Sequence, residues 1–170
     1  MKKALVVIDF QNDFVSGSLG FPKAETIRKP IVEKIEEALK DGTDLIFTMD
    51  THDCSYLFTK EGEGLPIEHC TKGHWGWELD DSILPYKSKA LVIEKSSFGS
   101  KMLGEILAKG AYDEVELCGL VTSICVLSNA VIAKTALPEA TIIVDSKATE
   151  DASEKASALA CLKAIQVSVL

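Results

Sequence analysis

The chain has 170 residues, 46% of them hydrophobic, and a formal net charge of −8 at pH 7. This length suits one compact domain with a full core, so we interpret residues 1–170 as a single domain. The acidic balance disfavours nucleic acid and anionic membrane surfaces as partners, because both need clustered Lys or Arg. A small-molecule substrate and a homo-oligomer both remain open.

The sequence carries no pattern typical of export or of a membrane span. The first apolar run, Ala4–Ile8, is too short for a signal peptide, and Asp9 follows it directly. The cysteine number is odd, and no two cysteines form a C-x-x-C pair. We therefore expect a cytoplasmic protein with reduced thiols.

Strands and helices are predicted to alternate through the first half. Ala4–Ile8 indicates a strand buried on both faces. Isoleucine or leucine then recurs every four residues over Ile27–Leu39, which predicts an amphipathic helix ending at Asp41-Gly42. Leu45–Met49 and Ala90–Glu94 indicate the second and third strands.

The same alternation continues to the end of the chain. Ser97 or Ser100 can cap a helix that stops near Gly110. The remaining predicted elements are a strand over Val115–Gly119, a helix over 122–136 ending before Pro138, a strand over Thr141–Val144, a helix over 152–164 and a strand over Gln166–Leu170. This order predicts a parallel α/β sheet with helices on both faces.

One segment interrupts this order. Residues 51–89 are rich in Gly, His, Trp and charged residues, and they are too many for an ordinary connection. Insertions of this size are usually functional, so we expect residues 51–89 to contribute to a binding site.

Polar residues follow four successive predicted strands. Asp9 follows the first, Asp50 and His52 the second, Lys95 the third and Cys125 the fourth. Ligands in open parallel sheets bind beyond the carboxyl ends of the strands. We therefore expect these side chains to converge on one site.

Cys125 is the candidate nucleophile of that site. It falls in the first turn of the helix after the fourth predicted strand. There the helix dipole and the free N–H groups favour a thiolate with a lowered pKa and can hold an oxyanion. The alternative is a small buried core residue, since free cysteine is often buried.

Asp9 and Lys95 are the candidate partners of Cys125. A carboxylate at the end of a buried strand needs a charged or hydrogen-bonding partner, and Lys95 can supply one. The ammonium should then depress the pKa of Asp9. With Cys125 they form a base, a cation and a nucleophile. The alternative is an ion pair that only braces the sheet.

All three histidines lie between residues 52 and 74. The D-x-H pair Asp50 and His52, together with His69, is a plausible site for Zn²⁺, Fe²⁺ or Mn²⁺ with open positions. Two alternatives remain: ordinary loop histidines, or a structural zinc site that also uses Cys54 and Cys70. No C-x-x-C pair supports the zinc alternative.

Three blocks of sequence, VVIDFQNDF, IEKSSFGS and LCGLVTSICV, together resemble the isochorismatase-like cysteine hydrolases, and the nicotinamidase branch in particular. The resemblance covers about residues 3–146. It implies a three-layer α/β/α sandwich around a six-stranded parallel sheet. It also implies that the chain hydrolyses a small carboxamide through a thioester, with nicotinamide giving nicotinate and ammonia as the first candidate reaction.

The resemblance also assigns residues to roles. Cys125 matches the nucleophile, Asp9 the general base and Lys95 the third catalytic residue. The N–H groups of Thr122 and Cys125 match the oxyanion hole, after a cis peptide bond expected at Val121–Thr122.

The same resemblance extends to the metal. Asp50, His52 and His69 match metal ligands, with Glu61 as the fourth candidate and Glu63 as the fallback. Phe14, Trp75 and Val121 are the candidate substrate-binding residues, although Trp75 and Trp77 can equally anchor the insertion. His74 has no assigned role.

Two other functions remain open at this stage. The chain can act on another carboxamide, a carbamoyl compound or an enol ether. It can also be a non-catalytic binding protein on the same fold.

Overall fold

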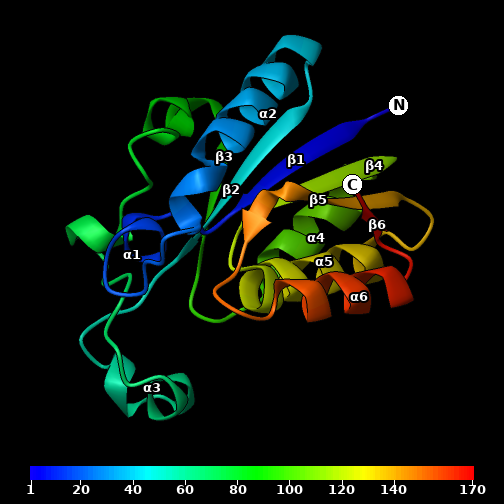
Figure 1. The fold of residues 1–170 in the computed structure, drawn as a ribbon. Helices are drawn as coiled ribbons and strands as arrows, with labels where there is room; N and C mark the ends of the chain where they lie inside the picture. The colour runs from blue at the N-terminus through cyan, green and yellow to red at the C-terminus, as the bar shows by residue number, and fades with distance from the viewer.

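The protein, described here over residues 1–170 by a computed structural model, is built on one six-stranded sheet (Figure 1). The strand order is β3-β2-β1-β4-β5-β6, and every neighbouring pair is parallel. The strands are β1 (Lys3–Ile8), β2 (Asp44–Asp50), β3 (Leu91–Lys95), β4 (Glu114–Leu120), β5 (Thr141–Glu150) and β6 (Ser168–Val169). The predicted parallel sheet is confirmed.

Helices cover both faces of this sheet. Figure 1 shows α2 on one side and α4, α5 and α6 together on the other, which gives the expected three layers. The helices are α1 (Asn12–Val15), α2 (Arg28–Asp41), α3 (Lys60–Gly64), α4 (Lys101–Gly110), α5 (Leu127–Ala136) and α6 (Lys155–Ala164). None of them is long and apolar enough to cross a membrane.

The central strand β1 separates two hydrophobic cores. Val6 and Ile8 face the core beneath α4, α5 and α6, whereas Leu5 and Val7 face the core beneath α2. All four side chains are buried. This double burial explains why β1 is a continuous apolar run and not an alternating one.

Several element ends lie where the sequence predicted them. Gly42 ends α2 in the left-handed conformation with φ 72°, and the Ser100 hydroxyl accepts a hydrogen bond from Leu103 N–H at the start of α4. The end of the chain differs from the prediction. β5 continues to Glu150 after a register shift against β4, and β6 has only two residues. The added part of β5 is polar, so no apolar pattern marked it.

The segment after β4 departs from the predicted single helix. Thr122–Val126 forms a π-helical turn, and the regular helix α5 begins only at Leu127. The cis peptide bond joins Leu120 and Val121, so the expectation of Val121–Thr122 was wrong by one residue.

The insertion is ordered by short helical turns and by contacts with the rest of the domain. It contains α3 and three 3₁₀ turns, at Tyr56–Phe58, Trp75–Trp77 and Leu84–Lys89. Gln11 forms a bridge with Leu79, and the Gln11 side chain donates to the carbonyl of Trp77 at 2.7 Å. These contacts place the insertion beside the carboxyl end of β1.

Gly119, the next-to-last residue of β4, is expected to tolerate no side chain. Its φ is 112°, and a Cβ atom there would overlap the carbonyl oxygen of Ile8. Gly119→Ala should lower the free energy of unfolding by about 3 kcal/mol or more, because strain and overlap add. Gly42→Ala is the matched control. Gly42 also has a positive φ but has open space around it, so Gly42→Ala should lower the free energy of unfolding by only about 1 kcal/mol. If urea denaturation gave the same loss of free energy of unfolding for both variants, the overlap of a Cβ atom with the Ile8 carbonyl would not be the cause.

Candidate active site and metal centre

The sheet order brings the predicted polar residues to one place. Asp9 follows β1, Asp50 ends β2, Lys95 ends β3 and Cys125 lies in the turn after β4. β1 and β4 are neighbours at the centre of the sheet, where the strand order reverses. A crevice at this reversal is the expected ligand site in such sheets.

Lys95 is the centre of the cluster. Its Nζ lies 2.6 Å from Asp9 Oδ2, 3.2 Å from Asp50 Oδ1 and 3.7 Å from Cys125 Sγ. It also donates to the carbonyl of Ser97 at 2.9 Å. The ammonium therefore joins the thiol, the Asp9 carboxylate and the second strand's carboxylate in one buried network.

Asp9 is fully buried and held from two sides. The Thr48 hydroxyl donates to Asp9 Oδ1 at 2.6 Å, while Oδ2 faces the ammonium of Lys95. Burial raises the pKa of Asp9, the charge of Lys95 lowers it, and burial prevails. Lys95 therefore lowers this pKa as expected, but desolvation of the carboxylate is the larger effect, so the net shift is upward and not downward.

The thiol of Cys125 also departs from expectation. Burial raises its pKa well above the usual value, and the charge of Asp9 adds to this, while Lys95 acts in the opposite direction. The lowering of this pKa that was predicted from the helix start is not seen. Cys125 is only 3% exposed, and it lies beside the carboxylate of Asp9. The resting thiol is therefore protonated, and its activation needs a base within contact range.

Asp50 connects this network to a second cluster. Its Oδ1 faces Lys95, and its Oδ2 lies 3.0 Å from His52 Nε2 and 3.4 Å from His69 Nε2. Hydrogen bonds from both histidines lower the pKa of Asp50 despite its burial. One carboxylate thus serves both groups of residues.

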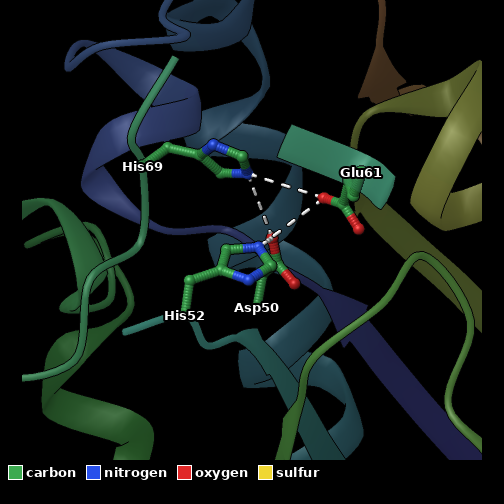
Figure 2. A group of neighbouring side chains, drawn as sticks. All are labelled: Asp50, His52, Glu61 and His69. Carbon is green, nitrogen blue, oxygen red and sulfur yellow. Dashed lines mark hydrogen bonds and ion pairs between the residues drawn. The ribbon is translucent and has the colours of Figure 1, made fainter. Parts of the chain in front are cut away.

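Figure 2 shows the second cluster, in which Asp50, His52, Glu61 and His69 point toward a common centre. One ligand atom from each lies within 4.8 Å of every other. Glu61 Oε1 is 3.6 Å from His52 Nε2 and 3.9 Å from His69 Nε2. Glu63, the fallback ligand, instead pairs with Lys60 at 2.7 Å.

These residues fit a divalent transition metal. Two imidazoles and two carboxylates form a donor set typical of zinc, iron or manganese. His69 Nδ1 lies 2.8 Å from the carbonyl of Ile67, an arrangement that fixes the ring and leaves Nε2 free to bind. Burial has the largest single effect on the pKa of His69 and lowers it, but the hydrogen bonds with Asp50 and Ile67 and the charges of Asp50 and Glu61 together raise it above its usual value. A proton therefore competes with a metal for this nitrogen.

A cavity of about 340 Å³ opens onto both clusters, since Cys125, Asp50, Glu61 and His69 all line it. Its volume lies within the usual range for small-molecule sites. The apolar part of its lining comprises Phe14, Leu19, Phe21, Leu65, Phe98, Val121 and Ile124. Phe14 and Val121 therefore line this cavity, and their contact with substrate stays a prediction.

Trp75 does not lie on this cavity. Its side chain is 61% exposed and lines a separate hollow with His74 and Cys54. Trp77 anchors the insertion instead, because its indole N–H donates to the Thr51 hydroxyl at 2.9 Å. The 3₁₀ turn over residues 75–77 sends the two tryptophans in different directions, and sequence spacing alone did not show this.

Two buried amides support the site and were missed by sequence reasoning. Gln11 brackets the backbone of Asp50, accepting from its N–H at 2.7 Å and donating to its carbonyl at 2.9 Å. Asn129 donates to the carbonyls of Cys125 and Phe98. Asn129 follows Cys125 by four residues, so a polar residue on the same helix face was the available signal.

Comparison with known proteins shows the family to which the chain belongs. The Isochorismatase domain model matches residues 3–169. An uncharacterized isochorismatase family protein of Bacillus subtilis is 33% identical, covering 77% of this chain and 78% of that protein. The nicotinamidase of Saccharomyces cerevisiae is 26% identical, covering 84% and 86%. A crystal structure of nicotinamidase/pyrazinamidase from Bacillus subtilis aligns with a TM-score of 0.88, 30% identity and 99% coverage of both chains.

The parallel sheet and its crevice of charged side chains are typical of a small-molecule hydrolase with a three-layer α/β/α fold. The chain belongs to the isochorismatase family, among its nicotinamidase-like amidohydrolases, and it is an enzyme that hydrolyses amide C–N bonds.

Proposed function

We propose that the protein converts nicotinamide, or a closely similar small carboxamide, to the carboxylate and ammonia through a thioester on Cys125. The observation that carries this proposal is the contact of Lys95 with Asp9 and with the sulfur of Cys125, at one wall of a cavity with aromatic lining. A planar ring fits an apolar wall of this kind.

Asp9 is the proposed base for the first half of the reaction. As the sulfur attacks the amide carbon, the thiol proton moves to Asp9 and the carbonyl oxygen gains negative charge. Burial raises the pKa of Asp9 and makes it a stronger proton acceptor than a free aspartate, although burial also raises the pKa of the Cys125 thiol. Lys95 then balances the charge around the sulfur.

The oxyanion is proposed to bind the N–H groups of Thr122 and Cys125. Other N–H groups of the turn have partners: those of Ile124 and Val126 donate to the Val121 carbonyl, and that of Ser123 donates to Asp151. The N–H groups of Thr122 and Cys125 take no part in these bonds. Backbone donors fixed in this way stabilise a developing oxyanion without reorganisation.

The first half ends when Asp9 returns its proton to the departing amine as the C–N bond breaks. In the second half, Asp9 accepts a proton from water as the water attacks the thioester carbon. The C–S bond breaks, the sulfur regains a proton and the carboxylate product leaves. Each half therefore uses Asp9 once as base and once as acid.

Asp50, His52, Glu61 and His69 are proposed to hold one divalent zinc, iron or manganese ion. When bound, the ion supplies a Lewis acid that can hold the ring nitrogen of a pyridine carboxamide. This role concerns binding and orientation of the substrate.

The metal assignment is tested by content and affinity. We expect roughly one transition metal per chain in elemental analysis, and a rise in melting temperature when the metal is returned after chelation. His69→Ala and Glu61→Gln should each weaken metal binding by about 100-fold or more. Glu63→Gln is the matched control and should bind metal like the wild type. The assignment would be contradicted if the purified protein contained no transition metal and if His69→Ala bound metal as the wild type does.

The substrate assignment is tested by ammonia release. Nicotinamide, other carboxamides and a carbamoyl compound should be compared by this assay at equal concentration, with metal content determined on the same sample. Hydrolysis of an enol ether releases no ammonia, so its turnover should be measured by the carbonyl product. We expect the largest kcat/KM for nicotinamide among them. A larger value for a carbamoyl compound would reassign the substrate. If none of these compounds is turned over and Cys125 does not react with iodoacetamide, the non-catalytic alternative is favoured.

A further inference from the structure

The cavity carries an unusual charge pattern for a site that must handle carboxylate products. Four acidic residues line it, and no Lys or Arg does: Asp50, Glu61, Asp151 and Glu154. Lys95 lies behind Cys125, and its side chain is 2% exposed and paired with Asp9 and Asp50. The cavity therefore presents carboxylates without a free cation to balance them.

The four carboxylates fall into two pairs. Asp50 and Glu61 belong to the metal cluster, where a bound divalent ion balances their two charges. Asp151 and Glu154 also line the cavity, and they belong to the short segment that leads into α6. Nothing in the metal cluster offsets this second pair.

Backbone hydrogen bonds stabilise the charged form of the Asp151 carboxylate. It accepts hydrogen bonds from the N–H groups of Ser123, Ser153 and Glu154 at 2.9 to 3.0 Å. Burial raises its pKa, but these hydrogen bonds lower it more, and the pKa lies below its usual value. Asp151 is therefore ionised at neutral pH, although it is only 7% exposed.

Glu154 adds a second charge at the mouth. Its side chain is exposed and lines the cavity, and only its backbone N–H is used by Asp151. The nearest lysine in sequence, Lys155, is paired with Glu150 at 2.6 Å and does not line the cavity. The field at the mouth is therefore negative.

Building on the proposed function, we propose that Asp151 and Glu154 select the charge of the substrate: the site accepts neutral and cationic amides and rejects amides that carry a carboxylate. Clefts lined by one sign of charge concentrate the opposite sign and repel the same sign. The same field acts on the product, because hydrolysis turns a neutral amide into an anion. Repulsion then speeds release and weakens product inhibition.

The first experiment compares three amides on one ring: pyridine-3-carboxamide, its 5-carboxylate and its 5-aminomethyl derivative. The readout is the ratio of kcat/KM for the cationic over the anionic compound. Glu154→Lys should lower this ratio by about tenfold at low salt, and about 1 M salt should abolish most of the difference. Glu105→Lys, on the exposed surface of α4, makes the same change in net charge away from the cavity and is the matched control.

A second experiment needs no turnover. Iodoacetamide is neutral and iodoacetate is anionic, and both alkylate a thiol with loss of iodide. Peptide mass spectrometry gives both rates at Cys125 and, in the same sample, at the exposed Cys161. The iodoacetamide-to-iodoacetate ratio should be higher at Cys125 than at Cys161, and Glu154→Lys should lower it at Cys125 several-fold.

The outcomes separate the two proposals. Ammonia release from the neutral amide, with Glu154→Lys matching Glu105→Lys in both ratios, would overturn charge selection and leave the proposed function standing. No ammonia release, with the alkylation ratio at Cys125 still reversed by Glu154→Lys, would overturn the proposed function and support charge selection.

Discussion

Cys125→Ala is expected to abolish amide hydrolysis while the fold persists. Loss of a covalent nucleophile typically costs on the order of 10⁴- to 10⁶-fold in turnover. The side chain is buried, so the fold should lose only about 1 kcal/mol for the missing sulfur. Steady-state ammonia release and urea denaturation on one preparation measure the two effects.

Cys118→Ala is the matched control for this variant. Cys118 is also buried, but it lies in β4 and faces the core beneath α2. It should lose similar stability and keep its activity. Turnover retained in Cys125→Ala would end the thioester proposal, and equal losses of activity in both variants would point to a general packing effect.

Lys95→Met is expected to have the largest effect on stability. The substitution leaves Asp9, which is fully buried, without its cationic partner. Breaking a buried ion pair from one side typically costs about 3 to 5 kcal/mol. The double variant Lys95→Met with Asp9→Asn should regain part of this loss, because no unpaired charge then remains. Both variants should be inactive.

The loss in Lys95→Met should also depend on pH. Without Lys95, the pKa of Asp9 rises further above that of the unfolded chain, because the ammonium is the main influence that lowers it. A raised carboxyl pKa costs stability above the unfolded pKa of about 4 and costs nothing below it. The difference in the free energy of unfolding between wild type and Lys95→Met should therefore become smaller from pH 7 toward pH 5. A gap independent of pH would indicate that lost packing, and not the charge of Asp9, causes the effect.

The sequence predicted the residues of the site better than their protonation. Asp9, Lys95 and Cys125 were identified because each follows a strand, and parallel strands end at one edge of a sheet. The pKa directions of Asp9 and Cys125 were predicted wrongly because they depend on burial. Burial depends on tertiary packing, and the residues adjacent in sequence do not determine it.

The supporting residues show the same division. Glu61 was chosen as a ligand only by resemblance, since α3 is a short helix within an insertion that has no periodic pattern. The structure brings its carboxylate to His52 and His69 while Glu63, two residues later, pairs with Lys60. Trp75 was placed on the cavity by its aromatic character, yet the turn that carries it faces another hollow.

By itself, the sequence determined the order of strands and helices, the buried central strand and the reactive groups at the strand ends, because these follow from local periodicity and chain order. Tertiary structure alone decided the position of the π-helical turn, the convergence of the insertion on Asp50 and the charge of the cavity mouth. These features depend on contacts between segments far apart in the chain, such as Ser123 with Asp151 and Gln11 with Asp50. Such contacts are fixed only when the whole core packs.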